Sequence, residues 1–191
     1  MRRRFALLAL VPFLLASCGG GSSASACTQQ YWDGTVGLCL PEGWNVVARE
    51  MLDERGLPEE VIAAFQAEKA VSGQFPTVTV LQETLSQDAD STAYSEASIR
   101  AVSTLPGYKL IDSKSVTIDG AAVTMHVFSA QPLPEEPERR FYQVSAVANK
   151  TGYTFTALTP MSISSGLETD VTTIIKSATL KEPSASNSSA K

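Results

Sequence analysis

The sequence predicts one α+β domain, and three observations support this prediction. Turn signals at Asp119-Gly120 and at 149–152 each separate two runs of alternating apolar residues, which is the pattern of β-hairpins. Two segments, 90–105 and 165–178, combine N-cap residues with apolar positions at helical spacing. A chain of 191 residues is long enough for one domain of ordinary size with a hydrophobic core.

The N-terminus predicts export and a lipid anchor. Arg2-Arg3-Arg4 precedes the apolar run Phe5–Ala16, which is shorter than the about 20 residues of a membrane-spanning helix and has the layout of a secretory leader. Leu15-Ala16-Ser17-Cys18 resembles the lipobox of bacterial lipoproteins. The resemblance implies diacylglyceryl transfer to the Cys18 thiol, cleavage before Cys18 and N-acylation. The alternative is an ordinary secreted protein in which Cys18 is incidental.

These signals divide the chain into a signal peptide (1–17), a lipid-anchored tether (18–26), a folded domain (27–182) and a disordered tail (183–191). The tether has no apolar side chain larger than Ala, and a random coil of this length holds the domain about 15–17 Å from the headgroups. Two or three acyl chains anchor stably. We therefore expect the domain at the extracytoplasmic face of a bacterial membrane; whether this is the inner or the outer membrane stays open.

The first predicted element of the domain is a hairpin between Cys27 and Cys39. A three-residue loop, Trp32-Asp33-Gly34, places the two cysteines directly opposite each other. In an oxidising compartment, with Cys18 carrying lipid, they form an even pair, so we predict a Cys27–Cys39 disulfide worth about 3 kcal/mol. A metal site would need further Cys or His ligands, and a redox-active pair usually has Cys-X-X-Cys spacing.

The next three elements are a strand, a helix and a strand. Trp44 lies on a strand after a turn at 40–43 and is predicted at or near the core. Pro58, followed by two glutamates, opens a predicted helix with Val61, Ile62, Ala64, Phe65 and Lys69 on one side. The run Thr77–Glu83 alternates as a half-buried strand.

The second half of the domain continues with helix, strands and helix. Asp88, Asp90 and Ser91 supply N-cap candidates for a helix that runs to about Leu105. Extended segments are predicted at 108–111, 114–118, 122–130, 140–148 and 153–159, with a Pro/Glu loop at 132–138. The final helix begins with the capping box Ser165–Glu168.

Segments spread over most of 40–180 resemble the PsbP-like α/β/α sandwich, in particular bacterial lipoproteins of the DcrB and LpqN/LpqT type. They are Leu40–Trp44, Pro76–Val80, Leu105–Tyr108, Ile118–Gly120, Tyr142–Val144 and Gly152–Thr156. The resemblance implies a single antiparallel sheet of about six to seven strands flanked by helices, in a family of mostly non-catalytic accessory or adaptor proteins. It brings no active-site motif, no metal and no cofactor to this chain.

Charge and motifs exclude several function classes. The formal charge is −5, and removal of the leader leaves 12 basic and 20 acidic residues, so the chain lacks the basic surface of a general nucleic-acid binder. His126 is the only histidine, and no obvious nucleophile with an orienting acid lies near it in sequence, so we interpret it as a structural or surface residue. The chain has no Gly-rich phosphate loop and no His-Glu-x-x-His motif.

Two residue pairs are candidates for partner binding. Tyr31-Trp32 is predicted at a hairpin tip, where exposed aromatics are typical of binding surfaces; the alternative is that Trp32 folds onto the core. Arg139-Arg140 would dock an anionic headgroup or an acidic partner, or else balance the neighbouring glutamates. We expect a non-catalytic envelope protein that binds a protein partner; the alternative is a carrier of a lipid or small ligand in a sheet–helix cavity of about 300 Å³ or more.

Overall fold

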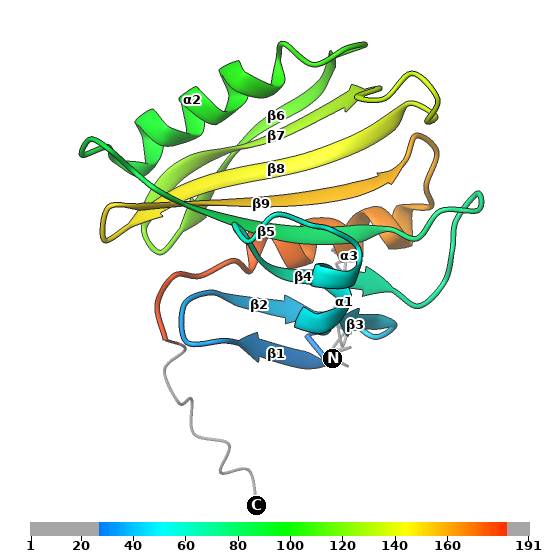
Figure 1. The fold of residues 1–191 in the computed structure, drawn as a ribbon, viewed down its shortest axis with the longest axis horizontal. Helices are drawn as coiled ribbons and strands as arrows, with labels where there is room; N and C mark the ends of the chain where they lie inside the picture. Colours follow the sequence, from blue (N-terminus) through cyan, green and yellow to red (C-terminus); the bar gives the residue numbers. More distant parts are fainter. Residues whose placement is uncertain (1–26, 183–191) are drawn as a thin grey trace, which may run out of the picture.

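A computed structural model describes residues 27–182 and shows a curved antiparallel sheet with helices on both faces (Figure 1). The sheet has seven strands in the order β3-β4-β5-β9-β8-β7-β6, and a separate two-stranded sheet pairs β1 with β2. The predicted α+β class, with a six- to seven-stranded antiparallel sheet flanked by helices, is confirmed. The signal peptide, Cys18, the tether and the tail 183–191 lie outside the described residues.

The strands and helices have the following bounds. The strands are β1 (Gln29–Trp32), β2 (Gly37–Leu40), β3 (Trp44–Val46), β4 (Val61–Ala67), β5 (Thr77–Thr84), β6 (Lys109–Ile118), β7 (Ala121–Ala130), β8 (Arg139–Ala148) and β9 (Thr151–Pro160). The helices are α1 (Arg49–Glu54), α2 (Ser91–Val102) and α3 (Ser165–Lys176).

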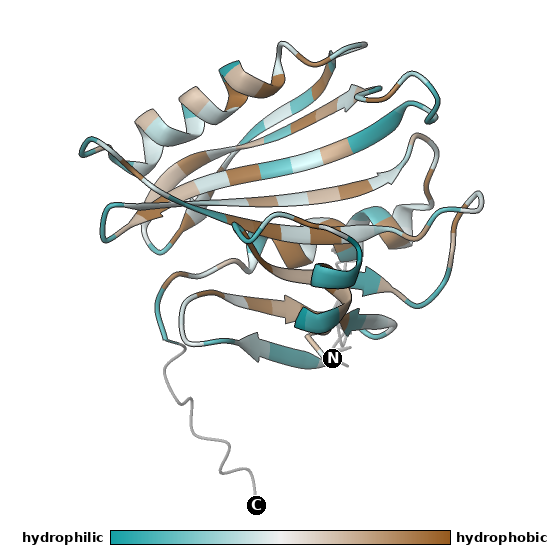
Figure 2. Ribbon diagram, in the orientation of Figure 1, coloured by the Kyte–Doolittle hydropathy of each residue, from teal (hydrophilic) through white to brown (hydrophobic). Residues whose placement is uncertain are grey.

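The hydrophobic core lies between the sheet and α3. Successive side chains of a strand point to opposite faces, and hydrophobic and hydrophilic segments alternate along the central strands in Figure 2. Helix α3 buries Val171, Ile174 and Ile175 completely against this face. The strands contribute Trp44, Phe65, Val78, Val80, Met125, Tyr142, Val144 and Phe155, and β2 adds Leu38 and Leu40.

The opposite face of the sheet carries α2 across β7 and β8 and buries polar side chains instead. The Ser145 hydroxyl donates a hydrogen bond to Ser98 Oγ on α2 at 2.9 Å. The hydroxyls of Tyr94 and Thr154 lie 3.3 Å apart. Buried hydroxyls are tolerated when they are hydrogen-bonded in this way. The two faces therefore differ in chemistry: the α3 side is an apolar core, and the α2 side combines hydrogen-bonded hydroxyl groups with aromatic and apolar side chains.

The β1–β2 hairpin differs from its prediction in register. Trp32 pairs with Gly37, and Gln30, not Cys27, lies opposite Cys39, so the connection has four residues rather than three. The reason is the Asp33 carboxylate, which accepts hydrogen bonds from the backbone N–H groups of Thr35 and Val36, each at 2.8 Å, and so stabilises the longer loop.

The helix predicted after Pro58 is wrong: Val61–Ala67 forms strand β4. Pro58 instead closes a turn, in which its carbonyl accepts a hydrogen bond from Val61 N at 3.0 Å. Five of the seven β4 residues are buried, on both faces of the sheet. A strand buried on both faces has a continuous apolar run, which periodicity does not distinguish from a buried helix segment. The helix of this region, α1, lies earlier in the chain and was not predicted.

The other helices are confirmed with small shifts at their ends. Asp90 is the N-cap of α2, and its carboxylate accepts a hydrogen bond from Ala93 N at 2.8 Å. Helix α2 ends at Val102, short of the predicted Leu105. Helix α3 is capped by Ser164, whose hydroxyl accepts from Leu167 N at 3.2 Å, so the predicted cap at Ser165 is one residue too late.

Candidate functional site

The structure contains the predicted disulfide between Cys27 and Cys39, with their Cα atoms 5.4 Å apart. Cys39 lies on the buried strand β2, and its backbone N–H donates to Ser177 Oγ at 2.8 Å, just after α3. Cys27 precedes β1 and is exposed. The bond therefore ties the first described residue of the domain to a strand that packs beside α3.

Tyr31 and Trp32 lie on β1 and are half-buried. The Tyr31 ring packs edge-on against Phe65, with centroids 4.9 Å apart. Burial, together with the nearby Asp33 carboxylate, raises the pKa of Tyr31 to about 12. A Cβ added to Gly37 would lie 3.0 Å from the Trp32 ring, so the ring lies close against β2. Both aromatics support the hairpin, and a role in partner binding stays a prediction.

Arg139 and Arg140 are adjacent on β8 and therefore point to opposite faces of the sheet. Arg139 pairs with Glu136 at 3.3 Å, and Arg140 lies 3.8 Å from Glu168 on α3. Their side chains are only 20% and 23% exposed. The pair neutralises local carboxylates, and a role in partner binding stays a prediction.

His126 is buried on β7, with 3% of its surface exposed. Its Nε2 lies 2.9 Å from the Tyr108 hydroxyl, and its ring stacks with Tyr108 and packs beside Phe128. Burial lowers the pKa of His126 below its ordinary value. These contacts describe a histidine that is packed among aromatic rings. In the described part of the chain, no group of three or more His, Cys, Asp or Glu is arranged to hold a metal ion.

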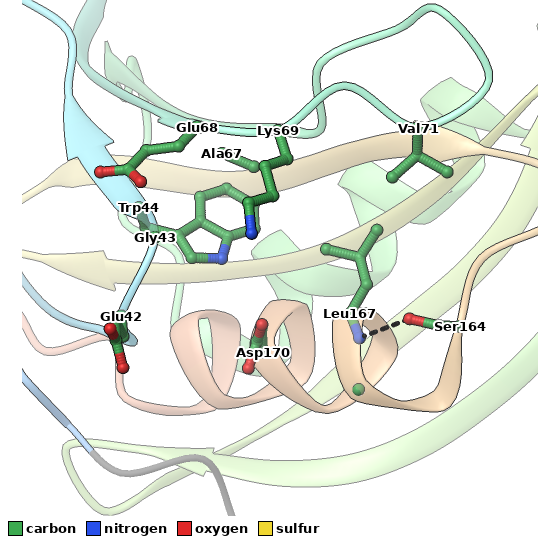
Figure 3. A pocket seen from close by; sticks show the side chains of 11 residues that line it. Glu42, Gly43, Trp44, Ala67, Glu68, Lys69, Val71, Ser164, Leu167 and Asp170 are labelled. Carbon is green, nitrogen blue, oxygen red and sulfur yellow. Dashed lines mark hydrogen bonds between the residues drawn. The ribbon is translucent and has the colours of Figure 1, made fainter.

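A hollow of about 450 Å³ lies between the start of α3 and the end of β4 (Figure 3). Trp44 and Leu167 form apolar parts of its wall. Its rim carries Glu42, Glu68 and Lys69. Figure 3 shows the Ser164 hydroxyl turned to the backbone of α3, where it accepts the hydrogen bond from Leu167 N as the N-cap. This backbone N–H group at the start of α3 therefore already has a partner within the protein.

Exposed apolar side chains gather at the two edges of the large sheet, a feature that the sequence reasoning missed. Six large hydrophobic residues of the described chain are at least 40% exposed. Val46, Met51 and Phe75 lie around the short edge strand β3, where they line or border one hollow. Leu110, Ile111 and Leu133 belong to the other edge strand, β6, and to the loop 131–138.

We call Leu110, Ile111 and Leu133 the β6-edge surface. They are 57%, 42% and 48% exposed, respectively. Ile111 is the extra residue of a β-bulge, because the register with β7 skips from Leu110 to Asp112. The loop that carries Leu133 is held at the start of β6 by a hydrogen bond of 2.9 Å from Gln131 N to the Pro106 carbonyl.

Charged pairs border the β6-edge surface. Lys109 Nζ lies 3.3 Å from Glu138, which also accepts a hydrogen bond from Ser129 at 2.8 Å. The Ser129 hydrogen bond and then the Lys109 ammonium lower the pKa of Glu138. Lys114 and Asp112 form a second pair at 2.6 Å. An apolar centre with a charged rim is the arrangement of many protein-binding surfaces.

A signal for this surface was present in the sequence. Leu110 and Ile111 are adjacent, and in a strand with regular alternation adjacent side chains face opposite sides. Two consecutive large apolar residues at the start of a predicted strand therefore require apolar neighbours on both faces of the sheet, a bulge, or an exposed position for one of them. The structure uses the last two solutions.

None of the helices within residues 27–182 combines the length and apolar character that a membrane span requires.

No protein-family model matches the sequence, and no curated protein matches it. Among solved structures, the chain is similar to cyanobacterial PsbP (CyanoP) from Synechocystis sp. PCC 6803, at 18% identity and a TM-score of 0.55, over 87% of this chain and 99% of that one. It is also similar to LpqN, involved in cell envelope biogenesis of Mycobacterium tuberculosis, at 13% identity and a TM-score of 0.53, over 77% and 85% of the two chains.

A third similar structure is a variant of the protein Mog1, at 10% identity and a TM-score of 0.51, over 80% of this chain and 95% of that one. At these identities the similarity establishes the architecture, not the activity. The sequence segments between 40 and 180 that resemble the PsbP-like sandwich predicted this fold, and the structural neighbours confirm it. This chain has a PsbP-like fold.

Proposed function

We propose that this chain is a lipid-anchored envelope protein that works without catalysis, by binding a protein partner through the β6-edge surface. The observation that carries the proposal is the exposure of Leu110 and Ile111 on the ten-residue edge strand β6, together with Leu133 on the loop 131–138. Singly exposed apolar residues are ordinary on protein surfaces, whereas a group at a sheet edge marks an interaction site.

Strand β6 offers a partner more than apolar contact. It is the last strand of the sheet, so its outer backbone N–H and C=O groups have no neighbouring strand within residues 27–182. A partner segment in extended conformation would add to this edge, with main-chain hydrogen bonds for affinity and apolar side chains against Leu110 and Ile111 for specificity. The opposite edge strand, β3, has only three residues and offers a much shorter ladder.

The edge also carries features that restrict which strands pair with it. The bulge at Ile111 interrupts the regular ladder, and Lys109, Asp112 and Lys114 place charges along the strand. Natural sheets use bulges and edge charges to prevent indiscriminate pairing. A partner must therefore match both the bulge and the charges, as expected for a specific complex rather than for aggregation.

Membrane attachment is proposed from the N-terminal sequence. The pattern Leu15–Cys18 after an apolar run of leader length supports lipidation of Cys18 and export. A protein of the same fold, LpqN, is involved in cell envelope biogenesis, which supports the same compartment for this chain. Mass spectrometry of the N-terminal peptide is expected to show a diacylated or triacylated Cys18. An unmodified Cys18 in the membrane fraction would contradict the anchor.

Partner binding is tested by affinity purification of the full-length chain from detergent-solubilised membranes. Replacement of Leu110 and Leu133 by Ser is expected to remove a specific co-purifying envelope protein. The matched control replaces Val46 and Phe75, on the β3 edge, by Ser and is expected to keep it. All four side chains are exposed, so the substitutions change stability by no more than about 0.5 kcal/mol each. Equal retention of the partner by both variants would refute the assigned surface.

A further inference from the structure

A groove of about 460 Å³ runs between α2 and the sheet, on the face opposite the apolar core. It forms because α2 lies over β7 and β8, as Figure 1 shows, and leaves the neighbouring strands β9 and β5 partly uncovered. Its volume is within the range of sites for small ligands. We call it the α2 groove.

The α2 groove has a mixed polar and apolar lining. On its floor, the hydroxyl groups of Thr79 and Thr156 lie beside the apolar side chains of Val61 and Leu81 from the same sheet. Ala97 and Ala101, one helical turn apart on α2, form an apolar wall together with Val102. Within residues 27–182, no Lys or Arg side chain lines this groove. This lining suits a neutral molecule that carries both polar and alkyl parts, and not an anion.

Gln143 supplies an unpaired acceptor on the floor of the α2 groove. The residue is 7% exposed, and its Nε2 donates a hydrogen bond to Thr156 Oγ1 at 3.4 Å. Its Oε1 is buried and has no hydrogen-bond partner among the described residues. A buried amide oxygen without a donor is unfavourable, because it loses its hydrogen bonds to water and gains none. Because this oxygen is shielded from the groove, a rotation of the Gln143 amide must bring it to the groove surface, where a donor on a bound molecule would satisfy it.

The Glu83 carboxylate is a second hydrogen-bond acceptor and lies at one end of the α2 groove. This carboxylate interacts with the Tyr94 hydroxyl, and burial followed by the effects of Glu83 raises the pKa of Tyr94 to about 12, so the tyrosine stays neutral. The groove therefore offers an amide oxygen and a carboxylate as acceptors. Both call for hydrogen-bond donors on the ligand.

We propose that the α2 groove binds a neutral amphipathic molecule that carries hydroxyl groups beside an alkyl chain. The hydroxyls donate to Gln143 Oε1 and Glu83 and exchange hydrogen bonds with the floor threonines. The alkyl chain packs against Ala97, Ala101 and Val102. The site is separate from the β6-edge surface, so it does not depend on the proposed partner binding.

The test is calorimetric titration of the full-length chain, held in phosphatidylcholine nanodiscs, with hexyl β-D-glucopyranoside and with empty nanodiscs as the blank. Saturable binding of one molecule per chain is expected. Hexyl sulfate has the same alkyl chain with an anionic headgroup, and glucose has the hydroxyls without the chain. Each is expected to bind at least tenfold more weakly. Heats equal to those of the blank, or equal affinity for hexyl sulfate, would overturn the proposal.

Three variants locate the binding in the groove. Ala101→Leu extends a side chain from an exposed helix position into the groove and is expected to weaken hexyl glucoside at least tenfold. Ala93→Leu makes the same change at an exposed α2 position outside the groove and is expected to bind as the wild type does. Equal affinities for these two variants would place the ligand elsewhere.

The third variant, Gln143→Met, keeps the length of the side chain and removes the unpaired acceptor. It is expected to weaken binding about tenfold, which corresponds to about 1.4 kcal/mol. Its thermal midpoint is expected to equal or exceed that of the wild type, because a buried unsatisfied oxygen is lost. Unchanged affinity would contradict the role of Gln143, and a folded variant with a normal midpoint excludes unfolding as the cause of weak binding.

Discussion

Removal of the Cys27–Cys39 cross-link should lower the free energy of unfolding while leaving the native fold in place. The hairpin is held by other contacts: Leu38 and Leu40 on β2 are fully buried, and Gly37 N donates to the Thr179 carbonyl at 2.8 Å. The bond therefore acts mainly by restricting the unfolded chain, in the loop-entropy account. We expect Cys27→Ala/Cys39→Ala to fold with unchanged near-ultraviolet circular dichroism.

The size of the effect follows from the length of the loop that the bond closes. The two cysteines are 12 residues apart, for which the loop-entropy relation gives about 3 kcal/mol at 25 °C. For a domain of this size, 1 kcal/mol shifts the thermal midpoint by about 2–4 °C. The double variant should therefore unfold about 6–12 °C below the oxidised wild type.

Equilibrium unfolding in urea, with and without a thiol reductant, measures this prediction and supplies its control. Reduction of the wild type should lower its free energy of unfolding to that of the double variant, and the double variant should not respond to reductant. A loss below about 0.5 kcal/mol in both comparisons would refute the reasoning, since the cross-link would then not restrict the unfolded chain.

Three further predictions test the α2 side of the sheet. Gly152→Ala should lower the free energy of unfolding by about 1–3 kcal/mol in thermal unfolding, because its Cβ would collide with the Tyr94 ring of α2. The control, Gly166→Ala at an open position of α3, should be neutral or stabilising by up to about 1 kcal/mol. Asp90→Ala should lower the free energy of unfolding by about 1 kcal/mol, because the α2 N-cap is lost. Asp88→Ala removes only an exposed ion pair with Lys150 and should lower it by less than half of that in the same measurement. Burial lowers the pKa of His126 from 6.5, so between the native pKa and 6.5 the unfolded chain takes up a proton that the native state does not. The free energy of unfolding should therefore fall as the pH decreases below 6.5 toward the native pKa. Urea titrations between pH 7 and 5 should show a smaller fall in His126→Gln than in the wild type.

Local chemistry explains which parts of the fold could be predicted. The turn at Asp119-Gly120 places both residues at positive φ, 51° and 92°, which suits Asp and Gly in a two-residue hairpin. Asn149 and Lys150 also take positive φ, 51° and 61°, and join β8 to β9. Each of these signals acts within a few residues of the chain, so sequence reasoning finds it without the tertiary structure.

The strand at 61–67, wrongly predicted as a helix, depends on tertiary contacts rather than on local signals. Ala63, Phe65 and Ala67 face the apolar core, while Val61 lines the α2 groove on the other side. Both environments arise only when β4 lies between its neighbours in the sheet, so the apolar run carries no period that identifies a strand.

The candidate sites were predictable only in part. The cysteine pair follows from counting and compartment, and the structure contains the bond. The α2 groove was not predictable, because Gln143 and Thr156 meet only through the register of β8 with β9, and the wall comes from a helix some 40 residues earlier in the chain. The position of the exposed apolar residues likewise depends on which strand ends the sheet.

The proposed function depends on the β6 edge being occupied in the cell, and site-specific photo-crosslinking tests this most directly. A photoreactive residue at Ile111 of the full-length chain should give one discrete protein adduct in the membrane fraction, and the adduct should disappear when Leu110 and Leu133 are replaced by Ser. The same probe at Lys176, which is exposed on α3, should give none. Equal adducts from both positions, or none from Ile111, would contradict the account.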